Sequence, residues 1–270
     1  MKFGVIITTY NSPLWLEKVL WGYENQSDPN FEVIIADDGS KKETANLIDK
    51  FKQRNKLKIL HVWHEDDGFR KTVILNKAIM QTQCDYLMFT DGDCIPRNDT
   101  IAIHKSHAKK GFYCSAAYFK LTMDISQLIT ENDIKLGNAF DYAWLIEKGL
   151  SKSYKSLKLT AGKWQKTLNK LTPTKATWNG ANSSAFKEDI LAVNGFDERM
   201  LYGGLDRELG ERMNNKGIKG IQLRYSTICI HLDHKRGYES SNIWVKNKAI
   251  RDEVKSKKLD WTNFGILKKI

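Results

Sequence analysis

An apolar run that ends abruptly in two carboxylates constrains this chain more than any other feature. Residues 86–89 are Tyr, Leu, Met and Phe, and Thr90, Asp91, Gly92 and Asp93 follow at once. A buried strand that delivers paired acids to the carboxyl edge of a parallel sheet is where open α/β proteins bind ligands. Carboxylate oxygens suit Mg²⁺ or Mn²⁺, and the glycine lets the backbone turn between the acids. The run predicts either a metal-diphosphate site or a capped turn, and its context decides between them.

Strands and helices alternate through the first 90 residues. Strands are predicted over residues 3–9, 31–36, 58–62 and 86–90, and helices over 13–25, 44–51 and 72–82. Ser12 as N-cap and Pro13 as first helical residue support the first helix. This alternation predicts an α/β fold, a Rossmann-like and mostly parallel sheet flanked by helices. Right-handed crossovers would place the loops after Thr9, Ala36 and Thr90 along one edge of the sheet.

The second half of the chain is less regular. At 270 residues the chain is long enough for one main domain. We expect four parts, which are the alternating half over residues 1–115, a basic and partly helical insertion over 116–176, a second half of the same domain over 177–245, and a basic C-terminal tail over 246–270. Within them, helices are predicted over 187–193 and 207–216, and a strand over 227–230.

Positive charge predominates and is unevenly distributed. There are 43 Lys and Arg residues against 32 Asp and Glu, a net charge of +11, which favours an anionic partner. Residues 148–175 hold eight lysines and no acid. On a helix, five apolar residues of this stretch would share one face, namely Leu157, Ala161, Trp164, Leu168 and Leu171. Such a face is typical either of a helix on a membrane surface or of a surface helix packed on its own core.

The sequence predicts a cytoplasmic protein without disulfides. No apolar run approaches the roughly 18 residues of a membrane-spanning helix. The N-terminus passes directly into a strand pattern instead of a signal peptide. Cys84, Cys94, Cys114 and Cys229 are scattered without a Cys-x-x-Cys pair, so reduced thiols are expected instead of a zinc site.

Four motifs of the first half occur in an order typical of one family. They are residues 7–11 (ITTYN), 37–40 (DDGS), 67–71 with 75–78 (DGFRK and LNKA) and 90–93 (TDGD). Three of them follow predicted strands and meet at one sheet edge, which suits a nucleotide with a metal on its phosphates. Together they resemble the family 2 glycosyltransferases of the GT-A fold. The resemblance covers about residues 1–115 and implies that this half binds a nucleotide sugar.

The second half carries an independent resemblance. Residues 179–183 (NGANS), 195–197 (GFD), 202–208 (YGGLDRE) and 230–231 (IH) resemble the C-terminal region shared by galactosyltransferases and bacterial chondroitin-type polymerases. The usual pattern there is Gly-Gly-Glu-Asp, and this chain has Leu205 in place of the Glu. In relatives this Glu helps to hold the acceptor sugar. The resemblance therefore implies a role for Asp206, but it does not imply a contact between Leu205 and the acceptor sugar.

The resemblance implies roles for five residues of the nucleotide site. Thr8 and Tyr10 would line the uridine pocket, and Asp38 would read the uracil edge. Arg70 would lie beside the base or the phosphates, and Asp91 would contact ribose and sugar. Asp38 as a turn acid and Arg70 as a surface cation stay open as alternatives.

Further residues are implied for the metal. Asp93 resembles the acid that binds the ion directly, and His231 matches a further ligand, with His234 or neither as alternatives. Imidazole beside carboxylate favours Mn²⁺ over Mg²⁺. His104 and His107 are three residues apart on a predicted helix, but they have no nearby Cys or acid and are expected to be exposed.

The reaction itself would fall to Asp206. An inverting transfer needs a carboxylate that accepts the proton of the acceptor hydroxyl, and Asp206 is the candidate, with a helix N-cap as its alternative. Glu208, in the first turn, is expected to interact with the helix dipole. Trp178, Asn182 and Gly204 are candidates for contacts with the acceptor or the donor sugar, and Trp178 is equally typical of a core.

The resemblance implies an inverting, metal-dependent glycosyltransferase. It would move a hexose or N-acetylhexosamine from a UDP-sugar to a saccharide or lipid-linked saccharide, in bacterial surface polysaccharide or lipopolysaccharide synthesis. The basic residues 148–175 and 246–270 would hold the enzyme on the anionic inner face of the cell membrane.

Other classes of protein stay open. A UDP-sugar-binding protein that has lost its acceptor site would carry the same motifs, with Leu205 as its mark. A nucleic-acid-binding protein would explain the charge but not the acids at the strand ends, so no nucleic-acid partner is expected. A nucleotidyltransferase would need a glycine-rich, basic phosphate loop, which residues 8–12 do not provide.

Overall fold

The computed structural model describes residues 1–234 and 241–268. The main sheet has seven strands in the order β3-β2-β1-β4-β8-β6-β9. Their bounds are Lys58–Trp63 (β3), Glu32–Asp37 (β2), Phe3–Thr9 (β1), Tyr86–Asp91 (β4), Ser183–Phe186 (β8), Phe112–Ser115 (β6) and Lys219–Gln222 (β9). Strand β8 runs antiparallel to both neighbours, and the other pairings of this sheet are parallel. The predicted α/β fold with a mostly parallel sheet is therefore confirmed.

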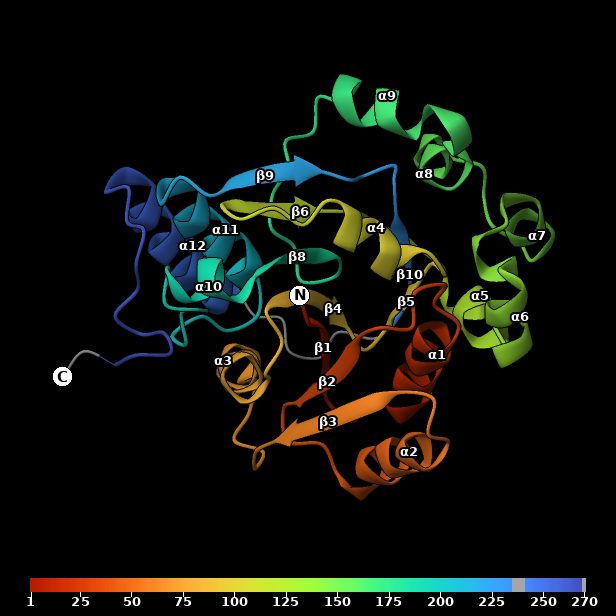
Figure 1. The fold of residues 1–270 in the computed structure, drawn as a ribbon, viewed down its shortest axis with the longest axis horizontal. Coiled ribbons are helices and arrows are strands. Elements are labelled where there is room, and N and C mark those ends of the chain that lie inside the picture. The colour runs from red at the N-terminus through yellow and green to blue at the C-terminus, as the bar shows by residue number, and fades with distance from the viewer. Residues whose placement is uncertain (235–240, 269–270) are drawn as a thin grey trace.

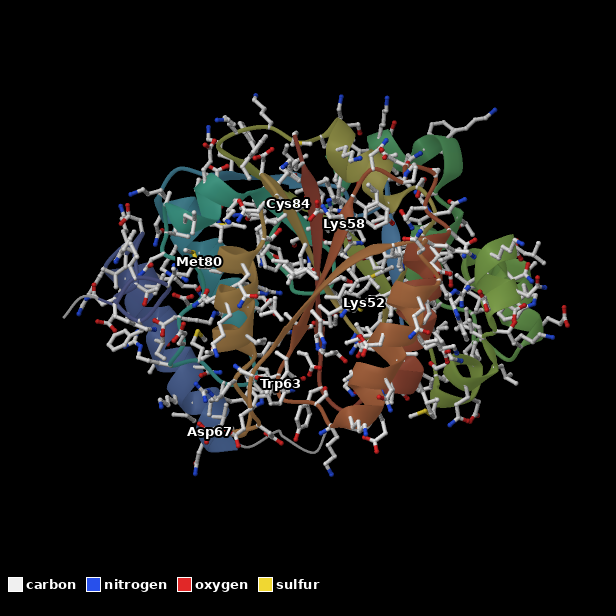
Figure 2. All side chains as sticks on the ribbon, turned by 60° about the horizontal axis from the view of Figure 1, so that its bottom comes forward. Lys52, Lys58, Trp63, Asp67, Met80 and Cys84 are labelled. Atoms are coloured by element: carbon white, nitrogen blue, oxygen red, sulfur yellow. The ribbon has the colours of Figure 1, made fainter. Side chains whose placement is uncertain are left out.

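Helices cover the first four strands from both sides (Figure 1). They are α1 (Pro13–Glu24) and α2 (Lys42–Gln53) on one side and α3 (Lys71–Gln81) on the other. Figure 2 shows the same arrangement from another direction, with Lys52 on α2 and Met80 on α3 on opposite sides of the strands.

Strands β1, β2 and β4 each contribute to two hydrophobic cores. Along β1, Val5 and Ile7 are buried in one core with Leu16 of α1, whereas Ile6 is buried in the other with Ile74 of α3. Successive side chains of a strand point to opposite faces, so a strand covered on both faces reads as an unbroken apolar run. This explains why the strands of the first half are evident in the sequence.

The parallel register sets which loops meet. Thr8 pairs with Ala36 of β2 and with Asp91 of β4, and Thr9 pairs with Asp37. The ends of β1, β2 and β4 therefore lie level at one edge of the sheet. The predicted convergence of three loops at this edge is confirmed.

A second sheet joins the two halves of the chain. Its order is β5-β10-β7, with bounds Cys94–Pro96, Ile228–His231 and Ala117–Lys120. Because β10 runs antiparallel to β5, His231 lies opposite Cys94, the residue after Asp93. The strand predicted over 227–230 is present, and it delivers His231 to the loop that follows β4.

The insertion after residue 116 begins with β7 and continues as short helices. These are α5 (Met123–Leu128), α6 (Glu131–Leu136), η1 (Asn138–Phe140), α7 (Tyr142–Glu147), η2 (Tyr154–Ser156), α8 (Leu157–Thr160), η3 (Gly162–Trp164) and α9 (Gln165–Leu171). Ile125, Ile134 and Leu145 are buried in the same core as α1. The Lys18 ammonium of α1 donates hydrogen bonds of 2.7–2.9 Å to the carbonyl oxygens of Ser126, Gln127 and Ile129. The first part of the insertion therefore extends the core of the domain.

The lysine-rich stretch 148–175 does not form one continuous helix. Gly162, with φ +46°, lies between α8 and α9. Of the five apolar residues expected on one face, Ala161 is buried, but Trp164 and Leu171 are 71% and 74% exposed. Packing on the domain's own core therefore holds for only part of that face.

Three helices complete the second half, α10 (Lys187–Leu191), α11 (Leu205–Asn215) and α12 (Ser241–Ser256). Helix α12 lies along α11 (Figure 1), where Ile250 and Val254 are buried and Arg251 pairs with Glu211 at 2.6 Å. The segment predicted as a tail from residue 246 thus contains part of a packed helix. Within residues 1–234 and 241–268, no helix is long and apolar enough to cross a bilayer.

Candidate active site

A pocket of about 1490 Å³ opens where the ends of β1, β2 and β4 face the second half of the chain. Most of the predicted site residues line it, namely Thr8, Tyr10, Asp38, Asp91, Asp93, Trp178, Gly204, Asp206 and His231. Arg70 and Asn182 are not part of the lining. Residues from both halves of the sequence therefore meet around one space.

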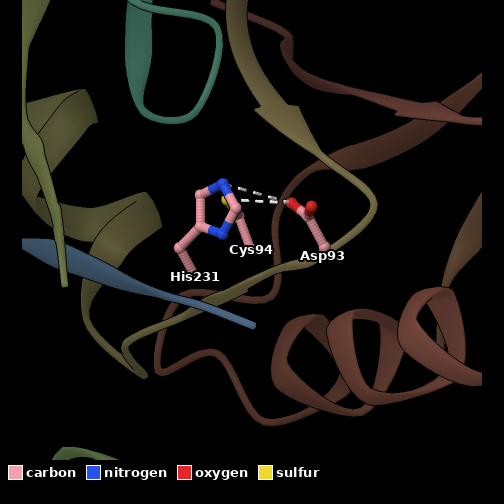
Figure 3. A group of neighbouring side chains, drawn as sticks. All are labelled: Asp93, Cys94 and His231. Atoms are coloured by element: carbon pink, nitrogen blue, oxygen red, sulfur yellow. Dashed lines mark hydrogen bonds and ion pairs between the residues drawn. The ribbon is translucent and has the colours of Figure 1, made fainter. Parts of the chain in front are cut away.

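Asp93 lies beside two histidines. The Nε2 atom of His234 is 3.0 Å from its Oδ2, and Nε2 of His231 is 4.0 Å from its Oδ1. The two imidazoles stack 5.8 Å apart with 13° between their planes. Figure 3 shows the His231 ring and the Cys94 thiol facing the Asp93 carboxylate. The sequence left His231 and His234 as alternatives, and the structure places both next to Asp93.

The donor atoms of this group fit a divalent cation. Nδ1 of His231 donates to the carbonyl oxygen of Leu232 at 2.9 Å, which leaves the lone pair of Nε2 free on the side of Asp93. Cys94 is a poor ligand because burial raises the pKa of its thiol, and the thiol donates to Asp93 Oδ1 at 3.4 Å. One carboxylate with two imidazoles is a donor set that suits Mn²⁺.

Asp91 is held by two donors. Its Oδ1 accepts hydrogen bonds from Thr8 Oγ1 at 2.9 Å and from the Lys71 ammonium at 2.5 Å. Burial raises the pKa of Asp91, but Lys71, His231 and Thr8 together lower it by more, so the net pKa lies below the ordinary value. Burial lowers the pKa of Lys71 in turn, and the carboxylates of Asp91 and Asp206 raise it by more. The pair is therefore ionised at neutral pH.

Lys71, instead of Arg70, lines the pocket. The Arg70 guanidinium pairs with Asp67 at 2.9 Å, outside the pocket, while its backbone N–H donates to Asp38 Oδ2 at 2.9 Å. The surface-cation alternative thus describes its side chain. The motif DGFRK offered two adjacent cations, and the start of α3 decides that Lys71 faces the site.

The second strand ends in two acids with different surroundings. Asp37 is fully buried and accepts from the Ser40 N–H at 2.8 Å, whereas Asp38 lines the pocket and bonds His64 Nε2 at 2.7 Å. Burial raises the pKa of Asp38, and His64 offsets part of this. Tyr10 is half exposed at the pocket and donates to Asp66 at 2.8 Å.

Asp206 lies in the first turn of α11. The N-cap position belongs to Gly204, so the N-cap alternative for Asp206 is wrong. Its Oδ1 atom is buried and has no hydrogen-bond partner in the part of the chain that the structure describes. Burial raises the pKa of Asp206, Lys71 lowers it and Asp91 raises it, and the net pKa is about 6. A carboxylate with an unused oxygen and a raised pKa is suited to accept a proton.

Two glycines let this carboxylate enter the pocket. Gly204 has φ +83°, in the left-handed region that favours glycine. Gly180 passes so close that a Cβ there would lie 2.7 Å from Asp206 Oδ1. The motifs NGANS and YGGLD therefore meet in space through the glycines that each contains.

Glu208 lies in the first turn of α11, as expected, and also has a buried partner. It is fully buried and forms a two-pronged ion pair with Arg212, with distances of 2.6 and 2.7 Å. The Arg212 guanidinium also donates to the carbonyl oxygens of Val193 and Gly195. Glu208 and Arg212 thus tie α11 to the loop that holds the GFD motif.

Burial corrects two more expectations and favours the core alternative for a third residue. His104 is fully buried instead of exposed, and bonds Asn182 Oδ1 at 2.9 Å and Ser184 at 2.6 Å. Asn182, also fully buried, donates to the carbonyl oxygen of Ala117 at 3.0 Å, so it braces the sheet instead of contacting a sugar. Burial lowers the pKa of His104 to about 4. Trp178 is fully buried against Phe89, with ring centres 5.3 Å apart, as its core alternative states.

An aromatic wall on the pocket was missed in the sequence. Phe69 and Tyr202 are in contact edge to face, with ring centres 6.0 Å apart, and Tyr202 has the same relation to Trp244. All three line the pocket. Gly203, with φ +99°, accommodates the Trp244 ring, since a Cβ there would lie 2.9 Å from it. The signal was Trp244, just before the segment that was predicted as a tail over residues 246–270.

Known proteins with related sequences share this architecture. Residues 4–126 match the family model described as Glycosyl transferase family 2. The chain is 26% identical over 277 residues to the uncharacterized glycosyltransferase YfnE of Bacillus subtilis (strain 168), which covers 89% of this chain and 67% of YfnE. It is 30% identical over 103 residues to the poly(ribitol-phosphate) beta-N-acetylglucosaminyltransferase TarS of Staphylococcus aureus, which covers 37% of this chain and 18% of TarS.

Solved structures show the same fold. TarS 1–349 in complex with UDP-GlcNAc matches with a TM-score of 0.63 at 16% identity, covering 96% of this chain and 69% of that one. The mannosyltransferase PcManGT from Pyrobaculum calidifontis, in complex with GDP-Man and Mn²⁺, matches with a TM-score of 0.59 at 20% identity, covering 88% and 58%. This chain therefore has the fold of the GT-A glycosyltransferases. The resemblance to glycosyltransferase family 2 is confirmed. The matched part is 67% of YfnE and 18% of TarS, so both relatives are longer than the part that this chain spans.

Proposed function

We propose that this protein is an inverting, metal-dependent glycosyltransferase that moves a hexose or N-acetylhexosamine from a UDP-sugar to a saccharide acceptor. The observation that carries the proposal is the Asp206 carboxylate, whose buried and unused Oδ1 lies in the same pocket as Asp91 and Asp93. The UDP-GlcNAc complex of TarS, a protein of the same fold, supports a UDP-sugar donor.

The donor would lie along the ends of β1, β2 and β4. Asp38 would accept from the uracil N–H, because His64 and the Arg70 backbone already fix its orientation. Tyr10 and Thr8 would line the uridine site. Asp91, kept ionised by Lys71, would accept from hydroxyl groups of the ribose and the donor sugar.

Asp93, His231 and His234 would hold a divalent ion, Mn²⁺ in preference to Mg²⁺. When bound, the ion offsets the charge on the departing UDP. The Mn²⁺ complex of PcManGT supports a metal in this fold.

Asp206 would act as the base. As the acceptor oxygen attacks C1 of the donor sugar, its proton passes to a carboxylate oxygen of Asp206, and the C1–O bond to UDP breaks on the opposite side. With a pKa of about 6, Asp206 is mostly ionised at pH 7 and ready to accept that proton. Leu205 is only 4% exposed, so the acceptor must be held by other residues than the one replaced in the Gly-Gly-Glu-Asp pattern.

Release of UDP from a panel of UDP-sugars with Mn²⁺, first without and then with saccharide acceptors, tests the proposal. One donor should be consumed, and Asp93→Ala should abolish turnover. Asp252→Asn, a change of an exposed acid on α12, is the matched control and should behave like the wild type. UDP that binds without consumption of any donor would favour a sugar-nucleotide-binding protein, and absence of UDP binding would refute the proposal.

The setting proposed is bacterial surface polysaccharide or lipopolysaccharide synthesis, on the cytoplasmic face of the membrane with a lipid-linked acceptor. What supports membrane contact is the exposed pair Trp164 and Leu171 beside Lys163, Lys166 and Lys170, which fits an anionic bilayer. Sedimentation with vesicles that contain anionic lipid tests it. Trp164→Ala should reduce sedimentation, and equal sedimentation with neutral vesicles would count against it.

A further inference from the structure

The pocket is lined by a group of cations as well as by the strand-end acids. Lys155, Lys158 and Arg224 contribute to the lining, together with Lys120 and Lys175. The acids of the lining are Asp38, Asp91 and Asp93 at the strand ends and Asp206 on α11. The lining therefore contains both a group of acids and a group of cations, which the net charge of the chain does not reveal.

Lys158 is the most enclosed lysine of this group. Its ammonium donates to the carbonyl oxygen of Tyr118 at 3.0 Å and lies 5.7 Å from the centre of the Tyr118 ring. Burial and the positive charges of Arg224 and Lys155 together lower the pKa of Lys158 to about 8. Like charges held together without a counter-charge destabilise one another, and a bound anion would relieve this cost.

Arg224 supplies a second, independent sign of a missing partner. Its Nε–H group is buried and has no hydrogen-bond acceptor among the described residues. Between residues 1–234 and 241–268, no ion pair reaches this guanidinium. Leaving a buried donor unsatisfied costs folding free energy, so such groups usually have a ligand or a function.

The position of Arg224 is fixed by the insertion. Asn169 of α9 accepts a hydrogen bond from the Tyr225 N–H at 2.9 Å and donates one to Ser226 Oγ at 2.7 Å. Gln222, at the end of β9, donates to the carbonyl oxygen of Thr174 at 2.8 Å. The lysine-rich segment and the Arg224 turn are therefore attached to each other, and the cations are held in place.

The cations lie close to the centre of the proposed reaction. The Tyr118 ring is 5.5 Å from the His231 ring on one side and 5.7 Å from the Lys158 ammonium on the other. A saccharide in the pocket beside Asp206 would extend from the acids into this region. The acids and Lys71 already provide a complete site for the donor, so the cations are available to a second substrate.

We infer that Lys158 and Arg224, assisted by Lys155, bind a negatively charged group of the acceptor, either a phosphate or a carboxylate. The inference rests on the proposed function and names its acceptor class. The anion would occupy the position where Arg224 Nε–H lacks an acceptor, and it would orient the acceptor hydroxyl toward Asp206. In this way the cations replace the acceptor contact that Leu205 cannot make.

Direct titration tests the inference without any need for turnover. Glucose 6-phosphate, glucuronate and glucose are titrated into the protein in the presence of UDP and Mn²⁺, and again in their absence. The wild type should bind at least one of the two anions about tenfold more tightly than glucose, as expected for one charge-assisted contact. Phosphate and carboxylate are distinguished by which of the two binds.

Variants locate the site. Arg224→Gln and Lys158→Met should each remove the preference for the anion, while Arg224→Lys should restore part of it. Lys163→Met, outside the pocket on the same segment, is the matched control and should retain the preference. Circular dichroism confirms that each variant is folded.

Two results would overturn the inference. One is equal binding of charged and neutral sugars by the wild type. The other is a loss of UDP affinity in Arg224→Gln, which would assign the cations to the donor diphosphate. A protein that binds the anions at these residues but does not bind UDP would refute the proposed function and leave the anion site standing.

Discussion

The two sides of the pocket are built in different ways. On the donor side, Asp91 ends β4 and Asp38 follows β2, so the hydrogen-bonded register of the strands fixes their height, and each acid has a close partner. On the opposite side, Lys158 and Arg224 lie on short helices and turns, and cation faces cation. The sheet thus holds acids whose charges are balanced by partners within the protein. The loops hold cations without such partners, so a bound ligand can supply the balancing negative charge.

Asp206→Asn should have the largest effect, because it removes the one acid that the described residues of the second half contribute to the pocket. Turnover should fall about 1000-fold, within the range for loss of a general base. UDP affinity should change little if the division of the pocket is correct. The rate of UDP release measures turnover, and a UDP titration measures affinity. A parallel loss of both would show that Asp206 also belongs to the donor side of the pocket.

Arg212→Met tests whether the acceptor half depends on its buried ion pair. The change leaves the Glu208 carboxylate buried without a partner, so the free energy of unfolding should fall by about 3–5 kcal/mol. Urea unfolding measures it. The double variant Glu208→Leu with Arg212→Met is the control and should recover part of the loss. A decrease below about 1 kcal/mol would contradict the importance assigned to this pair.

Lys71→Met and Arg70→Met form a matched pair on the donor side. Loss of Lys71 leaves Asp91 without its cation, so kcat/KM should fall about 100-fold. Loss of the Arg70 side chain removes only an exposed ion pair, so its effect should stay within about twofold. Steady-state kinetics with the preferred UDP-sugar decide between them. The reverse order would restore the original assignment of Arg70.

The pH dependence should give the smallest effect. Asp206 must be ionised to accept a proton, and its pKa is raised to about 6, so activity should be lost as the pH falls through that value. Between pH 7 and pH 5 the ionised fraction, and with it kcat at saturating donor and Mn²⁺, should fall about tenfold. Rates across this range measure it. A flat profile would show that Asp206 does not limit the reaction.

The sequence determined the donor side almost completely. Strands covered on both faces produce unbroken apolar runs, such as those that contain Ile6 and Phe89, and right-handed crossovers then bring their ends together. Thr8, Asp38, Asp91 and Asp93 therefore reach the pocket as predicted. These arguments need only local periodicity and a general rule of handedness.

Only the tertiary structure decided the rest. Whether Arg70 or Lys71 faces the site depends on how α3 starts, and whether His104 is exposed depends on Asn182, 78 residues away in sequence. The Arg224 group arises because α9 attaches to the turn before β10, a contact without a periodic signal in the chain. A side chain's partners from distant segments depend on packing, which the spacing of residues along a sequence does not encode.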